Sequence, residues 1–340
     1  MAVSAEAVFD RVERLNQLMS ELEPILQSVV MNDSVIIDGL AQMLATLQQM
    51  HARSDDRVNE VAQEVRDLAA QMTRWAAAAA PPAMEAASET DSFDLENPEI
   101  GLLAHLLPHL PNPVALDVGA NVGRVAERLV LAGYEVFAFE PFAESFAALA
   151  RRAEDEPRLH PHNLAIGPAD GRGELHVAVD LSEAGSWDTS LYHSLTTHPM
   201  LTDLKFSGVQ GVEIRSLASL IAQGAVPAEA SVLKIDTEGA DLDVIRGAGE
   251  ARFAVVTAEF WDEDHPFGRG GHGALPTLTR EMRARGYPWH IVIYRVDETE
   301  TLGFHCNARS SVPKSWGNAV FFRDFAHYGR AVAWCERRLA

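Results

Sequence analysis

The sequence has few cysteines, few lysines and no long apolar run. Its 340 residues include two cysteines, Cys306 and Cys335, which are too few for a disulfide framework and are typical of a reducing compartment. The first residues lack the basic flank, apolar core and small-residue cleavage site of a secretory signal, so we expect a cytoplasmic protein. No stretch approaches the roughly 20 consecutive apolar residues of a membrane-spanning helix, so we expect no transmembrane segment.

Basic residues are also scarce. Lysine and arginine together number 28 against 49 aspartates and glutamates, which gives a formal net charge of −21. Such a charge repels nucleic-acid phosphates and anionic lipid surfaces, and the sequence contains no basic patch that would override it. We therefore expect no nucleic-acid partner, and a neutral or cationic substrate rather than a phosphorylated one.

Glycine and proline are nearly absent from residues 1–75, which contain one of each. Apolar residues recur there at alternating spacings of three and four, over 36–50 and again over 58–75, as in coiled-coil heptads. The polar residues 54–57 shift the register as a four-residue insertion does, which is a stutter. We predict a helical coiled-coil oligomerisation region over 1–75, with an ordinary helical subdomain as the alternative.

The composition changes after this region. Residues 76–98 are rich in alanine, proline and small polar side chains, which is typical of a linker. Over 99–340, short apolar runs alternate with helical patterns: strands are expected at 114–117, 136–140, 232–236 and 255–260, and helices at 122–131, 142–153 and 242–245. Strands separated by helices form βαβ units, so we predict a doubly wound, Rossmann-like α/β domain with a parallel sheet and helices on both faces.

The first expected strand leads into a glycine-containing loop. Asp117 closes the strand, and Gly119 and Gly123 follow with G-x-x-x-G spacing, where glycine allows a tight turn and a close approach to a ligand. A dinucleotide fingerprint has its second glycine two residues after the first, but Asn121 stands there and would crowd a pyrophosphate. A nucleotide-dependent oxidoreductase is therefore disfavoured. The Asp117 carboxylate suits a cationic or hydroxylated ligand, and we place it in the cofactor site.

A second acid closes the next expected strand. Glu140 lies 23 residues after Asp117, and a carboxylate about 20 residues past the glycine turn can accept hydrogen bonds from both hydroxyls of a ribose. An acid in this position can also be only a helix cap or a solvated charge. The presence of both acids favours a binding role for Glu140.

Four segments together resemble the FkbM family of S-adenosylmethionine-dependent methyltransferases: residues 117–123 (DVGANVG), 139–141 (FEP), 163–167 (NLAIG) and 233–241 (LKIDTEGAD). The resemblance covers roughly residues 95–325. It implies a class I methyltransferase fold with seven strands, S-adenosylmethionine across the first two strand ends, and methylation of hydroxyls on sugars, polysaccharides or natural products. It also implies that Glu140 binds the ribose, that Asn163 and Ala165 neighbour the adenine, and that the methionine side is lined by Gly119, Asn121 and Gly123.

Paired carboxylates follow the strand at 232–236. Asp236 and Glu238 are expected beside the reacting methyl group, where they could bind substrate hydroxyls, act as a base or hold a cation. Alternatively, Glu238 and Asp241 favour the positive N-terminus of the next helix. Methyl transfer to a hydroxyl needs a base within hydrogen-bond reach. Asp236 is the first candidate for this base and His265 the second, and Glu238 completes the candidate catalytic residues.

Two loops are expected to cover the substrate. Residues 260–273, which follow Glu259 and contain four glycines, are predicted to form a mobile lid. Their acids and histidines match no metal-site spacing, so we predict no metal site there. Residues 191–198, which follow Ser190, are expected to cover the cofactor or bind substrate. Glu259, His193 and His198 are candidate substrate residues, although each histidine can also be an ordinary surface residue.

Together these features predict an S-adenosylmethionine-dependent O-methyltransferase that acts on a small-molecule or glycan acceptor. The N-terminal helices would make it a homo-oligomer, which suits a polymeric acceptor by raising the local concentration of catalytic domains. The alternative is a non-catalytic coiled-coil scaffold that carries a cofactor-binding, methyltransferase-like domain.

Overall fold

The computed structural model describes residues 97–182, 188–197, 203–268, 273–296, 301–308 and 310–339. The chain divides into two units, Met1–Ser88 and Glu89–Ala340, and the described residues all belong to the second. The predicted coiled coil, almost all of the predicted linker and His198 lie outside the described residues. Within the described part of the chain, no helix is long and apolar enough to cross a membrane.

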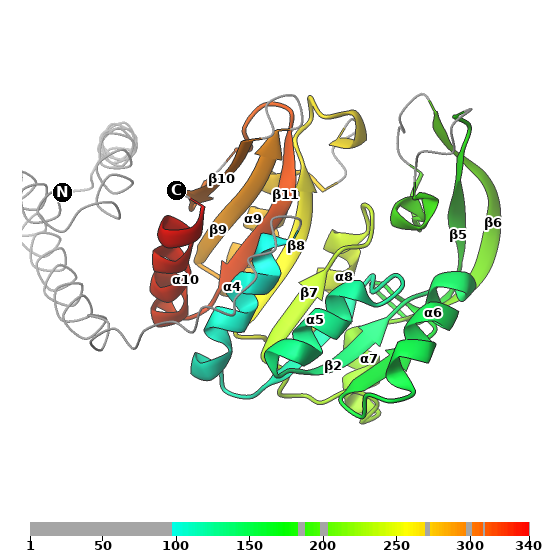
Figure 1. Cartoon of the computed structure of the whole chain (residues 1–340), viewed down its shortest axis with the longest axis horizontal. Helices are drawn as coiled ribbons and strands as arrows, with labels where there is room; N and C mark the ends of the chain where they lie inside the picture. Colours follow the sequence, from blue (N-terminus) through cyan, green and yellow to red (C-terminus); the bar gives the residue numbers. More distant parts are fainter. Residues whose placement is uncertain are drawn as a thin grey trace, which may run out of the picture. The chain divides into compact units, whose positions relative to one another are not determined.

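The main sheet has eight strands in the order β10-β9-β11-β8-β7-β1-β2-β3 (Figure 1). The five strands from β8 to β3 pair in parallel, whereas β11 pairs antiparallel with β8 and β9, and β10 pairs antiparallel with β9. The strands are β1 Val114–Val118, β2 Glu135–Phe139, β3 Leu159–His162, β7 Val232–Ile235, β8 Val255–Trp261, β9 Trp289–Val296, β10 Thr301–Cys306 and β11 Ser315–Phe322.

The predicted α/β class is confirmed, but the sheet is mixed rather than wholly parallel and has eight strands rather than seven. The difference arises at residues 289–322, where three strands follow one another with no described helix between them. Strands joined by short loops pair antiparallel, because a parallel pair needs a long crossover connection.

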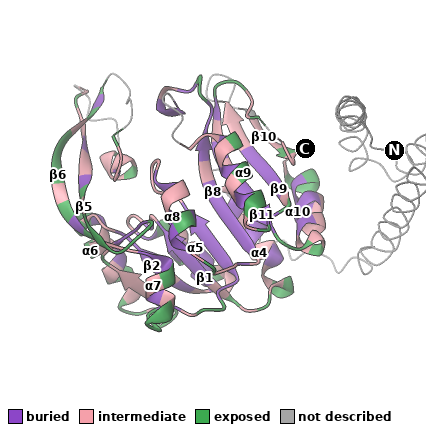
Figure 2. Ribbon diagram, turned by 180° about the vertical axis from the view of Figure 1, so that it is seen from behind, coloured by how far each residue is buried: buried purple, intermediate pink, exposed green. Residues whose placement is uncertain are grey.

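Helices cover both faces of the main sheet (Figures 1 and 2). Neighbouring residues of a strand point to opposite faces, so Val232 packs in one buried apolar cluster and Leu233 in another. The first cluster contains side chains of α4 Pro98–Leu106, α5 Arg124–Ala132, α6 Ala143–Ala153 and α10 Phe325–Arg338; the second contains those of α7 Leu217–Ala222, α8 Asp241–Gly247 and α9 Leu275–Ala284. Because the central strands are buried on both faces, their sequences are mainly apolar and do not alternate with polar residues.

The predicted helices at 122–131, 142–153 and 242–245 correspond to α5, α6 and α8, with ends that differ by no more than two residues. Helix α4 begins at Pro98, beside the predicted boundary at residue 99, and the short helix η1 Leu107–His109 follows it.

A second, smaller sheet was not predicted. Its strands are β4 Ala165–Ile166, β5 Gly171–Asp180 and β6 Leu204–Arg215, in the order β4-β6-β5. The two long strands stand beside the main sheet next to α6 (Figure 1) and are less buried than the central strands (Figure 2). The connection between them contains the short helix η2 Thr189–Tyr192, and a further short helix, η3 Pro266–Gly268, follows β8.

Candidate functional site

The loop after β1 packs directly against the end of β7. Gly119 has a φ of +82°, and a Cβ atom added there would lie 1.7 Å from the carbonyl oxygen of Asp236. The backbone N–H groups of Gly119 and Ala120 both donate to the Phe139 carbonyl oxygen, each at 3.0 Å. Glycine is therefore required at 119 both for the left-handed backbone and for the close approach of two chain segments.

Asn121 and Gly123 complete this loop, also with left-handed backbone. Asn121 has a φ of +49°, which is uncommon for a residue other than glycine, and its N–H donates to Glu140 Oε2 at 2.8 Å. Gly123 precedes the first turn of α5, and an added Cβ would lie 2.7 Å from Leu149 Cδ1. Gly123 thus lets α5 pack closely on α6, whereas Asn121 ties the loop to the end of β2.

Glu140 follows β2 and is nearly buried, with 7% of its surface exposed. Its Oε2 accepts from the Asn121 N–H at 2.8 Å and its Oε1 accepts from the Phe142 N–H at 2.7 Å. Burial raises the pKa of Glu140 to about 7, although these two hydrogen bonds lower it in part. Asn163 donates through Nδ2 to the Glu140 carbonyl oxygen at 2.9 Å, so Asn163 fixes the backbone that carries Glu140.

Lys234 is a functional candidate that the sequence analysis missed. Its side chain is 3% exposed, and its Nζ lies 3.2 Å from Asp117 Oδ1 and 3.3 Å from Asp236 Oδ2. Burial alone lowers the pKa of Lys234, but the carboxylates of Asp117 and Asp236 raise it well above its ordinary value. Asp117 and Lys234 are paired positions of β1 and β7, so knowledge of the strand order would have revealed this ion pair.

Glu99, in the first turn of α4, adds another carboxyl group near Lys234. It is 4% exposed, and burial raises its pKa from 4.5 to about 7, an effect that Lys234 reduces in part. Between pH 4.5 and about pH 7, Glu99 keeps a proton in the folded chain that it releases in the unfolded chain. The raised pKa therefore makes the folded state less stable as the pH rises through this window.

We expect Glu99→Gln to abolish this part of the pH dependence. Between pH 5 and pH 8 the free energy of unfolding of the variant should gain roughly 2–3 kcal/mol relative to wild type, because glutamine cannot ionise. Urea unfolding at both pH values measures this difference. Groups other than Glu99 titrate in both proteins, so their contributions cancel in the difference between the two free energies of unfolding. If that difference does not change with pH, the prediction is contradicted.

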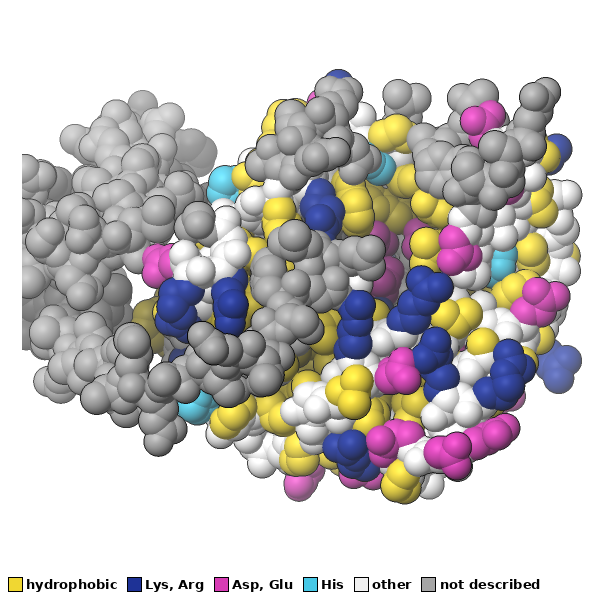
Figure 3. Space-filling model, viewed as in Figure 1, with side chains coloured by type: hydrophobic (Ala, Val, Ile, Leu, Met, Phe, Trp, Pro, Cys, Tyr) yellow, Lys and Arg dark blue, Asp and Glu magenta, His cyan; other side chains and the backbone are white. Residues whose placement is uncertain are grey.

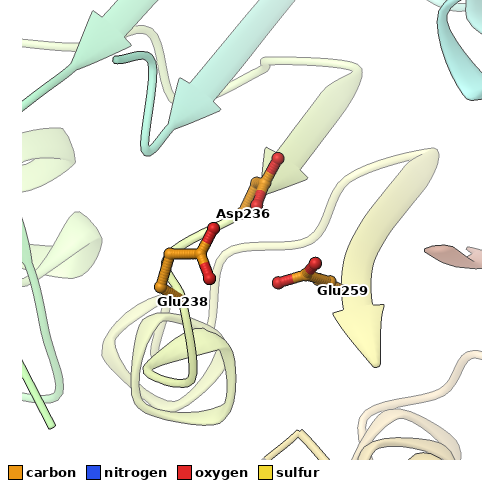
Figure 4. Close-up of side chains that lie close together, drawn as sticks. All are labelled: Asp236, Glu238 and Glu259. Atoms are coloured by element: carbon orange, nitrogen blue, oxygen red, sulfur yellow. The ribbon is translucent and has the colours of Figure 1, made fainter. Parts of the chain in front are cut away.

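Three carboxylates meet where β7 and β8 end (Figure 4). One oxygen each of Asp236, Glu238 and Glu259 lies within 4.8 Å of the others. Burial, and then the neighbouring carboxylates, raise the pKa of both Glu238 and Glu259. A cluster of this kind can take up a proton. Its carboxylate oxygens are also the ligands that hard divalent cations prefer. The Lys234 ammonium group, 3.3 Å from Asp236 Oδ2, opposes a cation at the Asp236 end.

Asp241 holds this acidic cluster together. It is 2% exposed, and it accepts from the Thr237 N–H at 3.0 Å and from the Glu259 N–H at 2.7 Å. Burial raises the pKa of Asp241 to about 6. From its place in the sequence Asp241 is expected only to favour the N-terminus of the following helix, but its carboxylate also connects the turn after β7 to β8.

A pocket brings together four of the seven predicted cofactor residues and two of the three clustered acids. The predicted residues Asp117, Gly123, Asn163 and Glu259 are not among the described residues that line it. Its walls come from the β1 loop, the ends of β2 and β7, the small sheet and the segment around η2, and include Gly119, Asn121, Glu140, Ala165, Ser190, His193, Asp236 and Glu238. In the space-filling view, acidic side chains lie recessed within a hollow of the visible face (Figure 3).

The two described candidate histidines lie in different surroundings. His193 lines the pocket, and its Nδ1 accepts from the Ala178 N–H at 3.1 Å, so Nε2 carries the proton of the neutral ring. His265 is 7% exposed, and its Nδ1 accepts from the Phe267 N–H at 3.3 Å. Its ring centroid lies 5.5 Å from that of Phe267. His265 is not one of the described residues that line the pocket.

The predicted lid is attached to the strand end at its first residues. Asp262, which is 6% exposed, accepts from the Lys314 N–H at 2.8 Å and from the Asp264 N–H at 3.1 Å. Its carboxylate therefore connects the segment after β8 to the segment before β11. Residues 269–272, which include two of the four glycines, lie outside the described residues.

Comparisons with known proteins agree with the resemblance in the sequence. The FkbM methyltransferase domain matches residues 117–287, half of the chain. The 2-O-methyltransferase NoeI of Sinorhizobium fredii is 26% identical over 160 residues, which are 45% of this chain and 65% of NoeI, so the chain spans less than two thirds of that relative.

Solved structures similar to this chain include two methyltransferases. Precorrin-6y C5,15-methyltransferase of Geobacter metallireducens is 10% identical, with a TM-score of 0.35 over 70% of this chain and 94% of that one. The 1,6-didemethyltoxoflavin-N1-methyltransferase of Burkholderia thailandensis is 12% identical, with a TM-score of 0.33 over 66% of this chain and 76% of that one. From the domain match over residues 117–287, the chain belongs to the FkbM methyltransferase family.

Proposed function

We propose that the protein transfers the methyl group of S-adenosylmethionine to a hydroxyl group of a sugar, glycan or natural product. One observation carries this proposal. Asn121 and Glu140, the candidate cofactor residues, line the same pocket as Asp236 and Glu238, the candidate catalytic acids. A methyl donor and an acceptor hydroxyl bound in this pocket would therefore lie side by side.

The residues of the β1 loop and the β2 end fit this cofactor. Each Glu140 carboxylate oxygen accepts one backbone N–H, which leaves each oxygen one lone pair for a ribose hydroxyl. Asn121 Oδ1 is buried, and no hydrogen-bond partner reaches it within the described part of the chain, so it is available to accept from the ammonium group of the methionine portion. When bound, S-adenosylmethionine supplies an electrophilic methyl group.

The acidic cluster supplies the base that an acceptor hydroxyl requires. Lys234 binds Oδ2 of Asp236, so the side chain is held at the pocket wall. Methyl transfer is an in-line displacement, for which the protein must align the acceptor oxygen with the methyl carbon. Asp236 would take the hydroxyl proton, and Glu238 and Glu259 would bind neighbouring hydroxyls of the acceptor.

The relative NoeI, a 2-O-methyltransferase, supports oxygen as the methylated atom. The formal net charge of −21 and the acidic cluster favour a neutral or cationic acceptor over a phosphorylated one.

Calorimetric titration with S-adenosylhomocysteine tests the cofactor assignment. Glu140→Ala removes the acceptor of two ribose hydrogen bonds, so we expect a loss of about 2–3 kcal/mol, or roughly 30- to 150-fold in affinity. Glu156→Ala is the control, because among the described residues the Glu156 side chain pairs only with the surface residue Arg158. It should bind like wild type.

Acceptors are then sought by incubating the protein and S-adenosylmethionine with a panel of methyl glycosides and measuring methylated sugar by mass spectrometry. Methylated product together with the loss in Glu140→Ala supports the proposal. Wild-type protein that binds no S-adenosylhomocysteine would contradict it and favour the non-catalytic scaffold instead.

A further inference from the structure

A short segment between β5 and β6 contacts both halves of the pocket. We call residues Asp188–Thr196 the bridging segment; it contains η2. The Oγ of Ser190 accepts from Asn121 Nδ2 at 3.2 Å, on the cofactor side. The Oγ of Ser194 donates to the Glu238 carbonyl oxygen at 2.6 Å, on the side of the acidic cluster. The ring of Tyr192 also packs against that of Phe267, with centroids 5.6 Å apart.

On the cofactor side, the hydrogen bonds fix which way the Asn121 amide faces. Asp188 Oδ1 accepts from both the Ser190 N–H at 3.2 Å and the Ser190 hydroxyl at 2.7 Å. Because the hydroxyl proton is used there, the Ser190 oxygen can only accept, so the Asn121 group that faces it must be the NH₂. Asn121 Oδ1 is thereby presented as an acceptor, buried and without a partner within the described residues.

On the acidic side, Ser194 stabilises a strained turn. Glu238 has a φ of +54°, which is a left-handed backbone conformation that residues with a side chain rarely adopt. Ser194 is 1% exposed, and it also pairs through its backbone with His176 of β5, at 2.8 and 3.2 Å. Its hydroxyl therefore connects the small sheet to the turn that directs the Glu238 side chain toward Glu259 (Figure 4).

We propose that the bridging segment couples the cofactor side of the pocket to the acceptor side. Ser190 is a positioning residue for Asn121, and Ser194 is a positioning residue for Glu238. A ligand bound to Asn121 Oδ1 fixes the Ser190 contact, and the same segment then holds the Glu238 turn in place for the acceptor. This coupling rests on the proposed function, since it requires that S-adenosylmethionine binds in the pocket.

Hydrogen exchange of the full chain, with and without S-adenosylhomocysteine, tests the coupling without an acceptor. Bound ligand should slow exchange about 10-fold in peptides covering 188–196 and in those covering 236–241. Exchange in α9, which lies outside the pocket walls, should not change. In Ser194→Ala the ligand should still protect 188–191, but protection of 236–241 should fall to what direct contact with the pocket wall at Asp236 and Glu238 provides, because the hydroxyl that joins the two segments is gone.

Calorimetry on matched variants tests the role of Ser190. Ser190→Ala should bind S-adenosylhomocysteine about 5- to 15-fold more weakly, because the Asn121 amide loses its fixed orientation. Ser190→Thr keeps the hydroxyl and should bind like wild type. Ser194→Ala should bind within 2-fold of wild type. Ser219→Ala is the control, since this serine donates to Asp170 at 2.6 Å in the same way as Ser190 donates to Asp188.

The outcomes separate this inference from the proposed function. If wild type does not bind S-adenosylhomocysteine, the proposed function fails and the coupling with it. If wild type binds but 188–196 is not protected, or if Ser190→Ala binds as tightly as wild type, the coupling alone is overturned.

Discussion

Replacing Asp236 by asparagine is expected to lower methyl transfer by about 10²- to 10⁴-fold, the usual contribution of a positioned general base. Asparagine keeps an oxygen that Lys234 can bind, but it cannot take a proton from an acceptor hydroxyl. The effect should appear in kcat for a methyl glycoside that wild type methylates, measured by the release of S-adenosylhomocysteine. Affinity for S-adenosylhomocysteine should stay within about 3-fold of wild type, since the cofactor is held mainly from the β1 and β2 ends.

Asp243→Asn is the matched control for this variant. Asp243 lies on α8, two residues after Asp241, and pairs with Arg246 on the same helix at 3.3 Å. It should retain wild-type turnover. Equal kcat values for Asp236→Asn and wild type would assign the base to another group, and Glu238, the other candidate catalytic residue that lines the pocket, would be tested next.

Replacing Lys234 by methionine is expected to reduce the free energy of unfolding by about 3–5 kcal/mol, because it leaves a buried charge without its partner. Asp117 is fully buried, and its Oδ1 lies 3.2 Å from Lys234 Nζ. Methionine has nearly the length of lysine, so the loss of packing should be small. Urea unfolding of the full chain at pH 7.5 measures the change.

A second variant separates charge from packing. Adding Asp117→Asn to Lys234→Met makes both members of the pair neutral and should restore more than half of the lost stability. If the double variant is no more stable than Lys234→Met, then packing around the lysine chain, rather than the unpaired Asp117 carboxylate, accounts for the loss.

The parts of the fold that follow from local pattern were predictable from the sequence. The strands ending at Asp117, Glu140 and Asp236 are apolar runs closed by acids, and α5 and α6 have clear helical periodicity. Because parallel strands end at one edge of a sheet, their closing acids were expected to lie together. The structure places Asn121, Glu140, Asp236 and Glu238 around one pocket.

Other features depend on which distant segments become neighbours. The Asp117–Lys234 pair requires that β1 and β7 lie side by side, and no local pattern states this. Ser190 and Ser194 have no distinctive sequence signal, because their roles come from Asn121 and Glu238 across the pocket. His265 was predicted as a base from its place after a strand, but the chain folds so that its ring packs beside Phe267.

The left-handed backbone at Asn121 and Glu238 implies a compromise between durability and activity. Glycine adopts this conformation without strain, so selection for thermal stability alone would favour glycine at both positions, by about 1 kcal/mol each. The chain instead keeps an amide and a carboxylate that face the pocket. Variants selected for heat resistance would therefore tend to lose the very side chains from which the proposed cofactor and acceptor sites are built.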